Sequence, residues 1–405
     1  MNQKLAVQGG QPVRKGPFPP YYPGASLYDE EEALAAARVI FARSPYRFYG
    51  PDCLNKVKSF ELGLAEKMQV KHALAVSSGT AAVIVALKAA GVGPGDKVIV
   101  PACTFIATGG AVICAGAVPV FAEIDDSLSM DPNKLESLID KDVKAIIPVP
   151  ILGNPCEMDK IMEIANRRGV TVIEDAAQSC GAVYKGKPIG TFGHINTYSL
   201  QMNKIMTTGE GGAVITDDDM LYERAVRYHD QGMYREKEGF LASSEEADVF
   251  VGQNYRLSEI AGAVAQVQLH KLDKMIAAMR KTKLQIKSQL QGIPGLGFRR
   301  ILDEEGDAGN ALIFLLQDAS RVEPFYEALK AERIPVSRLY NGQCSYMQPQ
   351  ILRQRTADPS GFPFNLFDPP VVYTEDMCPA SVEIMARNIT LMIGTTWSDQ
   401  DAEDV

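Results

Sequence analysis

A lysine, an aspartate and a short serine–glycine–threonine run stand in an order that could hold a phosphorylated aldehyde. Lys204 follows a short β-like run ending at Ser199, and a glycine-rich turn comes after it. Upstream, Asp175 ends the apolar run Val172-Ile-Glu-Asp175, and Ser77-Ser78-Gly79-Thr80 follows an earlier apolar run. A phosphate-binding turn, a buried acid and a lysine are the parts needed to bind pyridoxal 5′-phosphate (PLP). The sequence therefore predicts a PLP enzyme.

The serine–glycine–threonine run supplies the first of these parts. Ser78, Gly79 and Thr80 stand where an apolar strand gives way to a helix. Free backbone N–H groups and the helix dipole at such a junction favour an anion. Taken alone, the same residues are more often an ordinary helix cap.

The acid and the lysine supply the chemistry. A carboxylate at Asp175 would keep the pyridinium nitrogen of PLP protonated, and Gln178 could reach the phenolic oxygen of the ring. Lys204 would form the Schiff base with the cofactor. It would later move a proton between the substrate carbon and the cofactor carbon that are joined through the imine nitrogen. Phe105, after another apolar run, is the residue expected to lie on the ring. An aspartate capping a helix, a solvated lysine and a core phenylalanine are the alternative interpretations of these residues taken singly.

Composition limits the class of protein. The chain has 405 residues, of which 46% are hydrophobic and 22% charged, so a soluble enzyme of two packed lobes is expected. The net charge of −9 and the pI near 5.2 argue against a nucleic-acid groove or an anionic membrane surface as partner. Local arginines could still bind an anionic substrate.

Cysteine usage and the N-terminus indicate a cytoplasmic location. The seven cysteines are scattered, with no CxxC pair, so neither a disulfide framework nor a zinc site is expected, and no metal. The first residues lack an apolar signal core. The longest apolar stretch, 109–122, is too short to span a bilayer.

Apolar runs alternate with helical stretches through the first half of the chain. This rhythm predicts a mostly parallel, doubly wound α/β sheet with helices on both faces. Ligands bind such sheets at the carboxyl ends of the strands, where Ser78, Asp175 and Ser199 would meet. The expected strands are 72–77, 97–101, 118–123, 143–149, 170–175, 195–199 and 212–216.

These patterns divide the chain into four expected segments. Residues 1–28 are expected to form an extended N-terminal arm and 29–256 a large PLP-binding domain. A bridging helix is expected over 257–290, because apolar residues recur there at helical spacing. Residues 291–405 have an α+β texture and are expected to form a small C-terminal domain.

Several motifs together resemble the DegT/StrS family of PLP-dependent aminotransferases, which act mainly on keto-sugars, nucleotide sugars and cyclitols. The resemblance covers nearly the whole chain. Its motifs are Ser78-Gly-Thr-Ala-Ala82, Val100-Pro-Ala-Cys-Thr-Phe-Ile-Ala-Thr108, Glu174-Asp-Ala-Ala-Gln-Ser179, Ser199-x4-Lys204-x2-Thr-x-Gly-Glu-Gly-Gly212, Gly252-Gln-Asn-Tyr-Arg-Leu-Ser-Glu259 and Pro379-Ala-Ser-Val-Glu383.

This resemblance implies an aspartate aminotransferase-like fold (fold type I): a seven-stranded large lobe, a small lobe, and a homodimer with two shared active sites. It implies that Lys204 is the Schiff-base lysine, that Asp175 faces the ring nitrogen and that Gln178 faces the ring oxygen. Ser199 would join Gly79 and Thr80 at the phosphate, and Asn254 would reach the phosphate bound by the neighbouring subunit. The substrate-side residues that it implies are Arg47, Tyr49, Arg256 and Arg338.

Three positions depart from the family pattern. Many members have Ser-Phe where this chain has Ser199-Leu200, and His-Leu near Pro150-Ile-Leu-Gly153. Leu339-Tyr-Asn-Gly-Gln-Cys-Ser-Tyr346 also lacks the usual sugar-pocket pattern. These differences count against a standard nucleotide-sugar substrate and leave the cofactor chemistry unchanged.

Other segments resemble the branch that makes 8-amino-3,8-dideoxy-manno-octulosonate (8-amino-Kdo), an acidic sugar of lipopolysaccharide. They are Val70-Lys-His-Ala73, Phe121-Ala-Glu-Ile-Asp125, Phe298-Arg-Arg300 and Ile389-Thr-Leu-Met-Ile-Gly-Thr-Thr-Trp-Ser-Asp399. An acidic keto-sugar would be expected to meet Arg47, Arg256 or Arg338.

The leading hypothesis is an aminotransferase that takes nitrogen from an amino acid, L-glutamate being the expected donor, and passes it to the ketone or aldehyde of a sugar. Two alternatives keep PLP: sugar dehydration, or chemistry on a non-sugar ketone of a specialised pathway. The dehydratases of the family typically carry His in place of the lysine, so Lys204 counts against the first. A non-catalytic regulator would have no need of Lys204.

Overall fold

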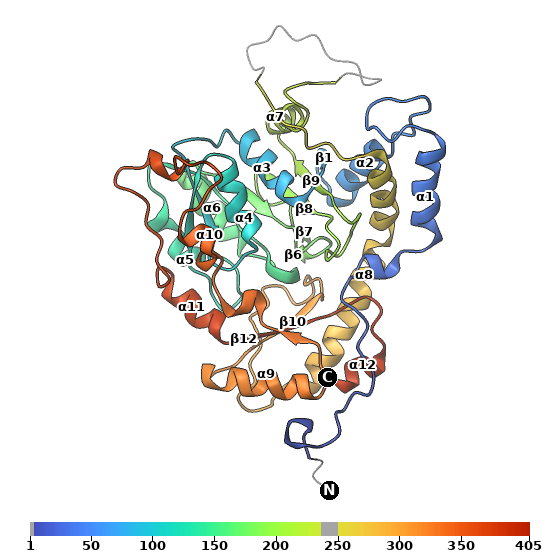
Figure 1. Ribbon diagram of the computed structural model, residues 1–405, viewed down its shortest axis with the longest axis vertical. Coiled ribbons are helices and arrows are strands. Elements are labelled where there is room, and N and C mark those ends of the chain that lie inside the picture. Colours follow the sequence, from blue (N-terminus) through green and yellow to red (C-terminus); the bar gives the residue numbers. More distant parts are fainter. Residues whose placement is uncertain (1–3, 236–249) are drawn as a thin grey trace.

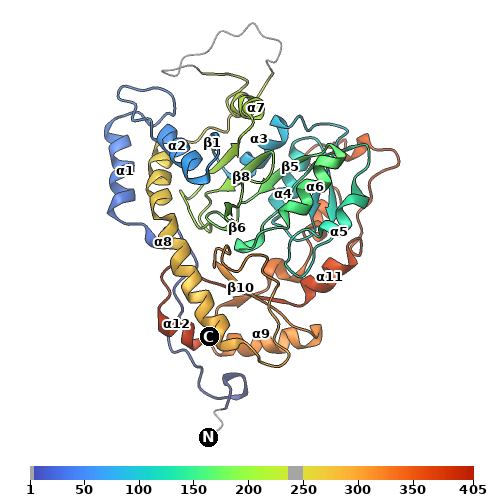
Figure 2. The same cartoon turned by 180° about the vertical axis from the view of Figure 1, so that it is seen from behind.

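The computed structural model of the protein describes residues 4–235 and 250–405. A large lobe and a small lobe are joined by one long helix (Figures 1 and 2). None of the helices in these two ranges is long and apolar enough to cross a membrane.

The large lobe is built on a seven-stranded sheet in the order β1-β9-β8-β5-β4-β2-β3. Only β9 runs against the other strands, so the expected mostly parallel sheet is confirmed. The strands in this order are β1 (His72–Val76), β9 (Gly212–Thr216), β8 (Ile195–Ser199), β5 (Thr171–Asp175), β4 (Val143–Ile146), β2 (Lys97–Pro101) and β3 (Val118–Ala122).

Both faces of the sheet are buried, as a parallel sheet requires. Successive residues of β1 show this: Ala73 and Ala75 join one hydrophobic cluster, while Leu74 and Val76 join the other. Helices α2 (Lys56–Met68) and α6 (Met158–Arg168) pack in the first cluster. The second cluster contains α3 (Gly79–Ala89), α4 (Ile106–Cys114) and α7 (Asp219–His229).

The long helix α8 (Glu259–Leu290) links the lobes. Its first half lies along α1 (Glu30–Phe41) and α2, and its second half runs into the small lobe (Figure 2). Met275, Met279 and Ile286 on this helix are buried, which agrees with the apolar stripe expected from the sequence.

The small lobe is a three-stranded antiparallel sheet backed by helices. Its strands lie in the order β10 (Ala311–Leu315), β12 (Asn388–Met392), β11 (Val336–Ser337). Helices α9 (Val322–Ala331) and α12 (Asp399–Asp404) flank it. The remaining short elements are α5 (Pro132–Leu135), β6 (Val183–Tyr184), β7 (Lys187–Pro188), α10 (Pro349–Leu352) and α11 (Pro379–Ala386).

The N-terminal arm crosses the small lobe toward the large one (Figure 1). Arg14 on the arm pairs with Asp401 and Asp404 of α12 at 2.5 and 2.8 Å. Further along, Thr395 donates a hydrogen bond to the carbonyl of Pro23. These contacts fix the arm, so that the residues between them can serve as part of a binding site.

A buried ion pair stabilises the junction between α8 and the loop that enters β10. Lys283 Nζ lies 2.5 Å from Asp307 Oδ2, and both side chains are almost fully buried. Burial lowers the pKa of Lys283 to about 8, against the opposing effect of Asp307. The next residue in the loop, Ala308, donates to the carbonyl of Gly153 in the large lobe.

We therefore expect Asp307→Asn to lower the free energy of unfolding by about 3 kcal/mol, because it leaves the Lys283 ammonium buried without a counter-charge. Adding Lys283→Met should restore part of the loss, since it removes that ammonium. Urea denaturation of the three proteins measures both effects. A double variant less stable than Asp307→Asn alone would contradict this account.

Candidate active site

One large cavity opens at the carboxyl edge of the sheet, between the two lobes. Its volume is about 730 Å³, and three parts of the chain line it. The large lobe contributes the ends of β1, β5 and β8 with the turns that follow them, and the small lobe contributes residues 337–340 and strand β12. The arm contributes residues 20–22. The cavity therefore lies at the carboxyl edge of the sheet, where the sequence predicts the ligand site.

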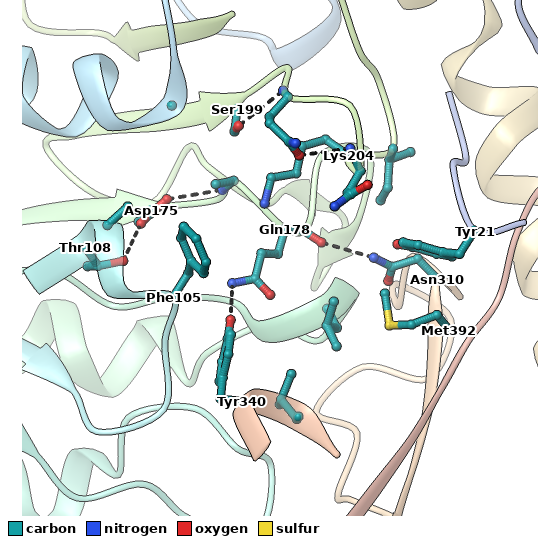
Figure 3. Close-up of a pocket in the computed structure, with 18 of the residues that line it drawn as sticks. Tyr21, Phe105, Thr108, Asp175, Gln178, Ser199, Lys204, Asn310, Tyr340 and Met392 are labelled. Carbon is teal, nitrogen blue, oxygen red and sulfur yellow. Dashed lines mark hydrogen bonds between the residues drawn. The ribbon is translucent and has the colours of Figure 1, made fainter. Parts of the chain in front are cut away.

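Asp175, at the end of β5, and Lys204, in the turn after the neighbouring β8, face this cavity (Figure 3). Asp175 is the last residue of β5 and is 5% exposed. Burial raises its pKa, while the hydroxyl of Thr108 and the charge of Lys204 lower it. Thr108 Oγ1 donates to Asp175 Oδ2 at 2.9 Å.

Lys204 lies in the turn after β8, held by a hydrogen bond from its own N–H to the carbonyl of Gln201. Burial lowers the pKa of its ammonium, and Asp175 counteracts this. Among residues 4–235 and 250–405, Nζ makes no hydrogen bond. A partly desolvated amine with free Nζ is suited to nucleophilic and proton-transfer chemistry.

An anion cradle lies beside these two residues, at the start of α3. Ser78 caps the helix, its side chain accepting from the N–H of Ala81 at 3.0 Å. The N–H groups of Gly79 and Thr80, in the first turn, point out of the helix without an intrahelical acceptor. Ser199 stands so close that a Cβ on Gly79 would meet Ser199 Oγ at 2.8 Å. Such a helix start, with two hydroxyls beside it, fits a phosphate group.

An aromatic face and an amide complete the large-lobe side of the cavity. Phe105, just before α4, is 55% exposed in spite of its size, and its ring faces the cavity (Figure 3). Gln178 Nε2 donates to the hydroxyl of Tyr340 at 3.0 Å, and the Gln178 carbonyl accepts from Asn310 Nδ2. A flat ring could therefore lie against Phe105, between Asp175 and Gln178.

These residues fit PLP. The cradle at α3 matches its phosphate, the Asp175 carboxylate its ring nitrogen, and the free amine of Lys204 its aldehyde. A polar amide at Gln178 matches the ring oxygen. Each pairing joins a group of the cofactor to a residue of complementary charge or hydrogen-bonding type.

Four of the expected residues lie away from this cavity within the single chain. Arg47 is buried against Glu61, and its Nη1 donates to the carbonyl of Ala75 at 2.9 Å. Arg256 pairs with Asp230. Tyr49 is 60% exposed on the surface, and Asn254 accepts a hydrogen bond from the Arg256 N–H. The structure thus gives Arg47 and Arg256 structural ion pairs instead of a place in this cavity.

Arg338 does line the cavity, but its guanidinium is already engaged. Its Nη2 donates to the carbonyl of Ala386 at 2.6 Å. The guanidinium also lies behind Gly342, where a Cβ would meet it at 2.5 Å. It is the one arginine among the expected substrate residues that this chain brings to the site.

The expected set of site residues missed several that line the cavity, and five of them bear on its shape or polarity: Tyr21, Thr108, Leu152, Asn310 and Tyr340. Thr108 could have been found, because it stands three residues after Phe105 at a helix start. The other four come from the arm, from loops and from the small lobe, where no periodic pattern indicates which side chain turns inward.

Two of these residues hold unusual backbone angles. Leu152 has φ +46° and Tyr340 has φ +49°, in the left-handed region that non-glycine residues seldom occupy. Arg299, fully buried, donates to the carbonyls of Ile151 and Leu152, each at 2.6 Å. Both strained residues belong to segments in which the sequence departs from the family pattern.

The comparisons with known proteins agree with this geometry. Residues 50–405 match the model of the DegT/DnrJ/EryC1/StrS aminotransferase family. The chain belongs to this family. Membership also confirms the expected cofactor, since this is a family of PLP enzymes with the fold type I architecture.

Two curated relatives and one solved structure show how far the similarity extends. The chain is 42% identical to a GDP-perosamine synthase of Caulobacter vibrioides over 226 residues, which is 56% of this chain and 59% of that protein. It is 37% identical to an L-glutamine:2-deoxy-scyllo-inosose aminotransferase of Streptomyces kanamyceticus over 286 residues, 69% of this chain and 66% of that protein. The matches therefore span less than two thirds of each relative's length. The structure of S. venezuelae DesV is 28% identical, with a TM-score of 0.80 over 96% of both chains.

The close approach of Gly79 to Ser199 gives a test of the anion cradle. Gly79→Ala should weaken PLP binding roughly 5- to 150-fold, because the new methyl group displaces Ser199 at a cost of about 1–3 kcal/mol. Gly110→Ala in α4 is the matched control, since its Cβ would have nothing within 4 Å. Fluorescence titration of the cofactor-free protein with PLP measures both. Equal affinities of Gly79→Ala and Gly110→Ala for PLP would show that the phosphate binds elsewhere.

Proposed function

We propose that this protein is a PLP-dependent aminotransferase that moves an amino group from an amino acid to the ketone or aldehyde of a sugar or cyclitol. The observation that carries the proposal is the free Nζ of Lys204 in the same cavity as the buried Asp175 carboxylate. Family membership and the names of the two relatives support it.

Each residue at the site then has a role. PLP, when bound, supplies an electron sink for breaking a bond at the amino-bearing carbon. Ser78, Gly79, Thr80 and Ser199 bind its phosphate. Phe105 covers its ring and excludes water from that face.

The remaining roles concern protons. Asp175 holds a proton on the ring nitrogen by its negative charge, and Gln178 donates to the ring oxygen. Lys204 binds the aldehyde and then takes and returns the proton at the reacting carbon. The lowered pKa of Lys204 favours this, because an amine that loses its proton more readily than an ordinary lysine is better able to act as a base.

The identities of the amino donor and of the acceptor are more specific proposals. L-Glutamate is the donor expected from the family resemblance, and L-glutamine is the donor in the name of the Streptomyces relative. For the acceptor we propose a keto-sugar or cyclitol ketone. The narrower expectation of 8-amino-Kdo synthesis, and with it lipopolysaccharide, stays a prediction. Its acidic acceptor would need a cation, and Arg338 is the arginine that lines this cavity, with its Nη2 donating to the carbonyl of Ala386.

Lys204→Ala should abolish amino transfer, since Lys204 is the one lysine among the described residues that line the cavity. The absorption spectrum of the PLP-loaded protein, before and after L-glutamate or L-glutamine, follows the reaction directly. Wild type should lose the visible band of lysine-bound PLP with one of these donors, and the variant should have no such band. Lys134→Ala, at an exposed lysine, serves as control. A variant that still transfers nitrogen would refute the role of Lys204, and a wild-type band that ignores every amino acid would refute the aminotransferase.

We also propose a homodimer with shared active sites, in which Asn254 reaches the phosphate bound by the other subunit. The position of Asn254 outside its own cavity supports this. Lys204→Ala and Asn254→Ala should each be inactive alone. After mixing with subunit exchange, about a quarter of wild-type activity should return, because half of the dimers are mixed and each has one intact site. No recovery, with exchange verified by mass spectrometry, would contradict shared sites.

A further inference from the structure

Two threonine hydroxyls form a chain behind Asp175 that the proposed function does not use. Thr104 Oγ1 and Thr108 Oγ1 lie 2.8 Å apart, and Thr108 Oγ1 lies 2.9 Å from Asp175 Oδ2 (Figure 3 shows the second contact). Each threonine is 2% exposed. Water is thus kept from both hydroxyls, so their hydrogen-bond partners are those of the protein.

While Asp175 is ionised, the hydrogens of this chain can point in only one direction. An ionised carboxylate accepts hydrogen bonds and cannot donate, so Thr108 donates to Asp175. A hydroxyl has one hydrogen, and that of Thr108 is then used. Thr104 must therefore donate to Thr108. Hydrogen bonds aligned in this way polarise one another, which strengthens the last bond to the carboxylate.

The two oxygens of Asp175 consequently differ. Oδ2 is held by the hydroxyl chain, whereas Oδ1 receives the N–H of Ala177 in a longer contact of 3.3 Å. The Thr197 hydroxyl also lowers the pKa of this carboxyl, but by less than Thr108 does. Oδ1 is thus the oxygen left for a strong bond to a group in the cavity. The orientation of the carboxylate is set from behind, before any cofactor binds.

The chain also opposes the effect of burial on Asp175. Burial raises the pKa of this carboxyl, and the Thr108 hydrogen bond is the largest of the contributions that lower it. The titratable groups that face Asp175 are Lys204, from the turn after β8, and Tyr340, from the small lobe. Tyr340 stays neutral because burial raises its pKa, so Lys204 is the only charge among them.

We propose that Thr104 and Thr108 are positioning residues that keep Asp175 ionised and turn its Oδ1 toward the cofactor. They act through the carboxylate and have no direct part in bond making. The inference rests on the proposed function only for the group that meets Oδ1, the ring nitrogen of PLP.

The titration of Asp175 in cofactor-free protein tests this without any enzymatic reaction. Difference infrared spectroscopy follows the carboxyl band, with Asp175→Asn identifying the signal. Thr108→Val, which keeps the shape and removes the hydroxyl, should move the titration midpoint to higher pH, because the ionised form loses its best donor. Thr108→Ser should restore it. Thr104→Val should move it in the same direction by a smaller amount.

Thr191→Val is the matched control: Thr191 is also buried and donates to a backbone carbonyl, that of Pro188, away from the cavity. Its midpoint should equal that of the wild type. A wild-type midpoint in Thr108→Val would overturn the proposal, and a larger shift in Thr104→Val than in Thr108→Val would overturn the direction of the chain. Should Thr108→Val fail to fold, Thr104→Val, which retains the Thr108 hydroxyl, gives the same test.

In the PLP-loaded enzyme, Thr108→Val should lower kcat on the order of tenfold at neutral pH, with the acid limb of the kcat profile moved to higher pH. Thr108→Ser should recover most of this loss. A shifted Asp175 titration in a protein that transfers no nitrogen would support the hydroxyl chain and refute the aminotransferase. An unshifted Asp175 titration in a protein that does transfer nitrogen would refute the hydroxyl chain and support the aminotransferase.

Discussion

The structure depends on keeping two opposite charges, Asp175 and Lys204, close together in a cavity that is largely removed from water. Burial works against both charges, raising the pKa of the aspartate and lowering that of the lysine. Each charge partly offsets the penalty of the other. The result is a carboxylate that needs hydrogen-bond donors behind it and an amine that loses its proton readily. Most of the surrounding architecture can be understood as support for these two groups.

The sheet provides the rigid part of that support. Parallel strands end at one edge, so β1, β5 and β8 deliver Ser78, Asp175 and Ser199 to the same place. Strand β9 closes the arrangement beside them. It begins at Gly212, where any Cβ would meet the carbonyl oxygen of Ser78 at 2.4 Å. Gly212, the last glycine of the run after Lys204, is therefore required by packing against the start of α3.

The other side of the cavity is lined by one strained residue from each lobe, Leu152 from the large lobe and Tyr340 from the small lobe. Left-handed backbone at Leu152 and Tyr340 costs on the order of 1–3 kcal/mol per residue and persists only where other contacts impose it. Arg299 imposes it at Leu152 through two carbonyl bonds. At Tyr340 the turn is held by the bond from the Leu339 N–H to Asn388 Oδ1. This side of the cavity is thus shaped by contacts between the lobes at Leu152 and by a contact within the small lobe at Tyr340.

The sequence by itself determined the sheet and the cofactor side of the site. Apolar runs of strand length mark where chain must be buried on both faces, and Ser78, Asp175 and Ser199 stand at their carboxyl ends, where parallel topology brings them together. What only the tertiary structure decided is the rest of the cavity. Tyr21, Asn310 and Tyr340 enter it from the arm and small lobe, and Arg47 is turned away to Glu61. These placements depend on how two lobes pack, and contacts between residues distant in sequence leave no periodic signal along the chain.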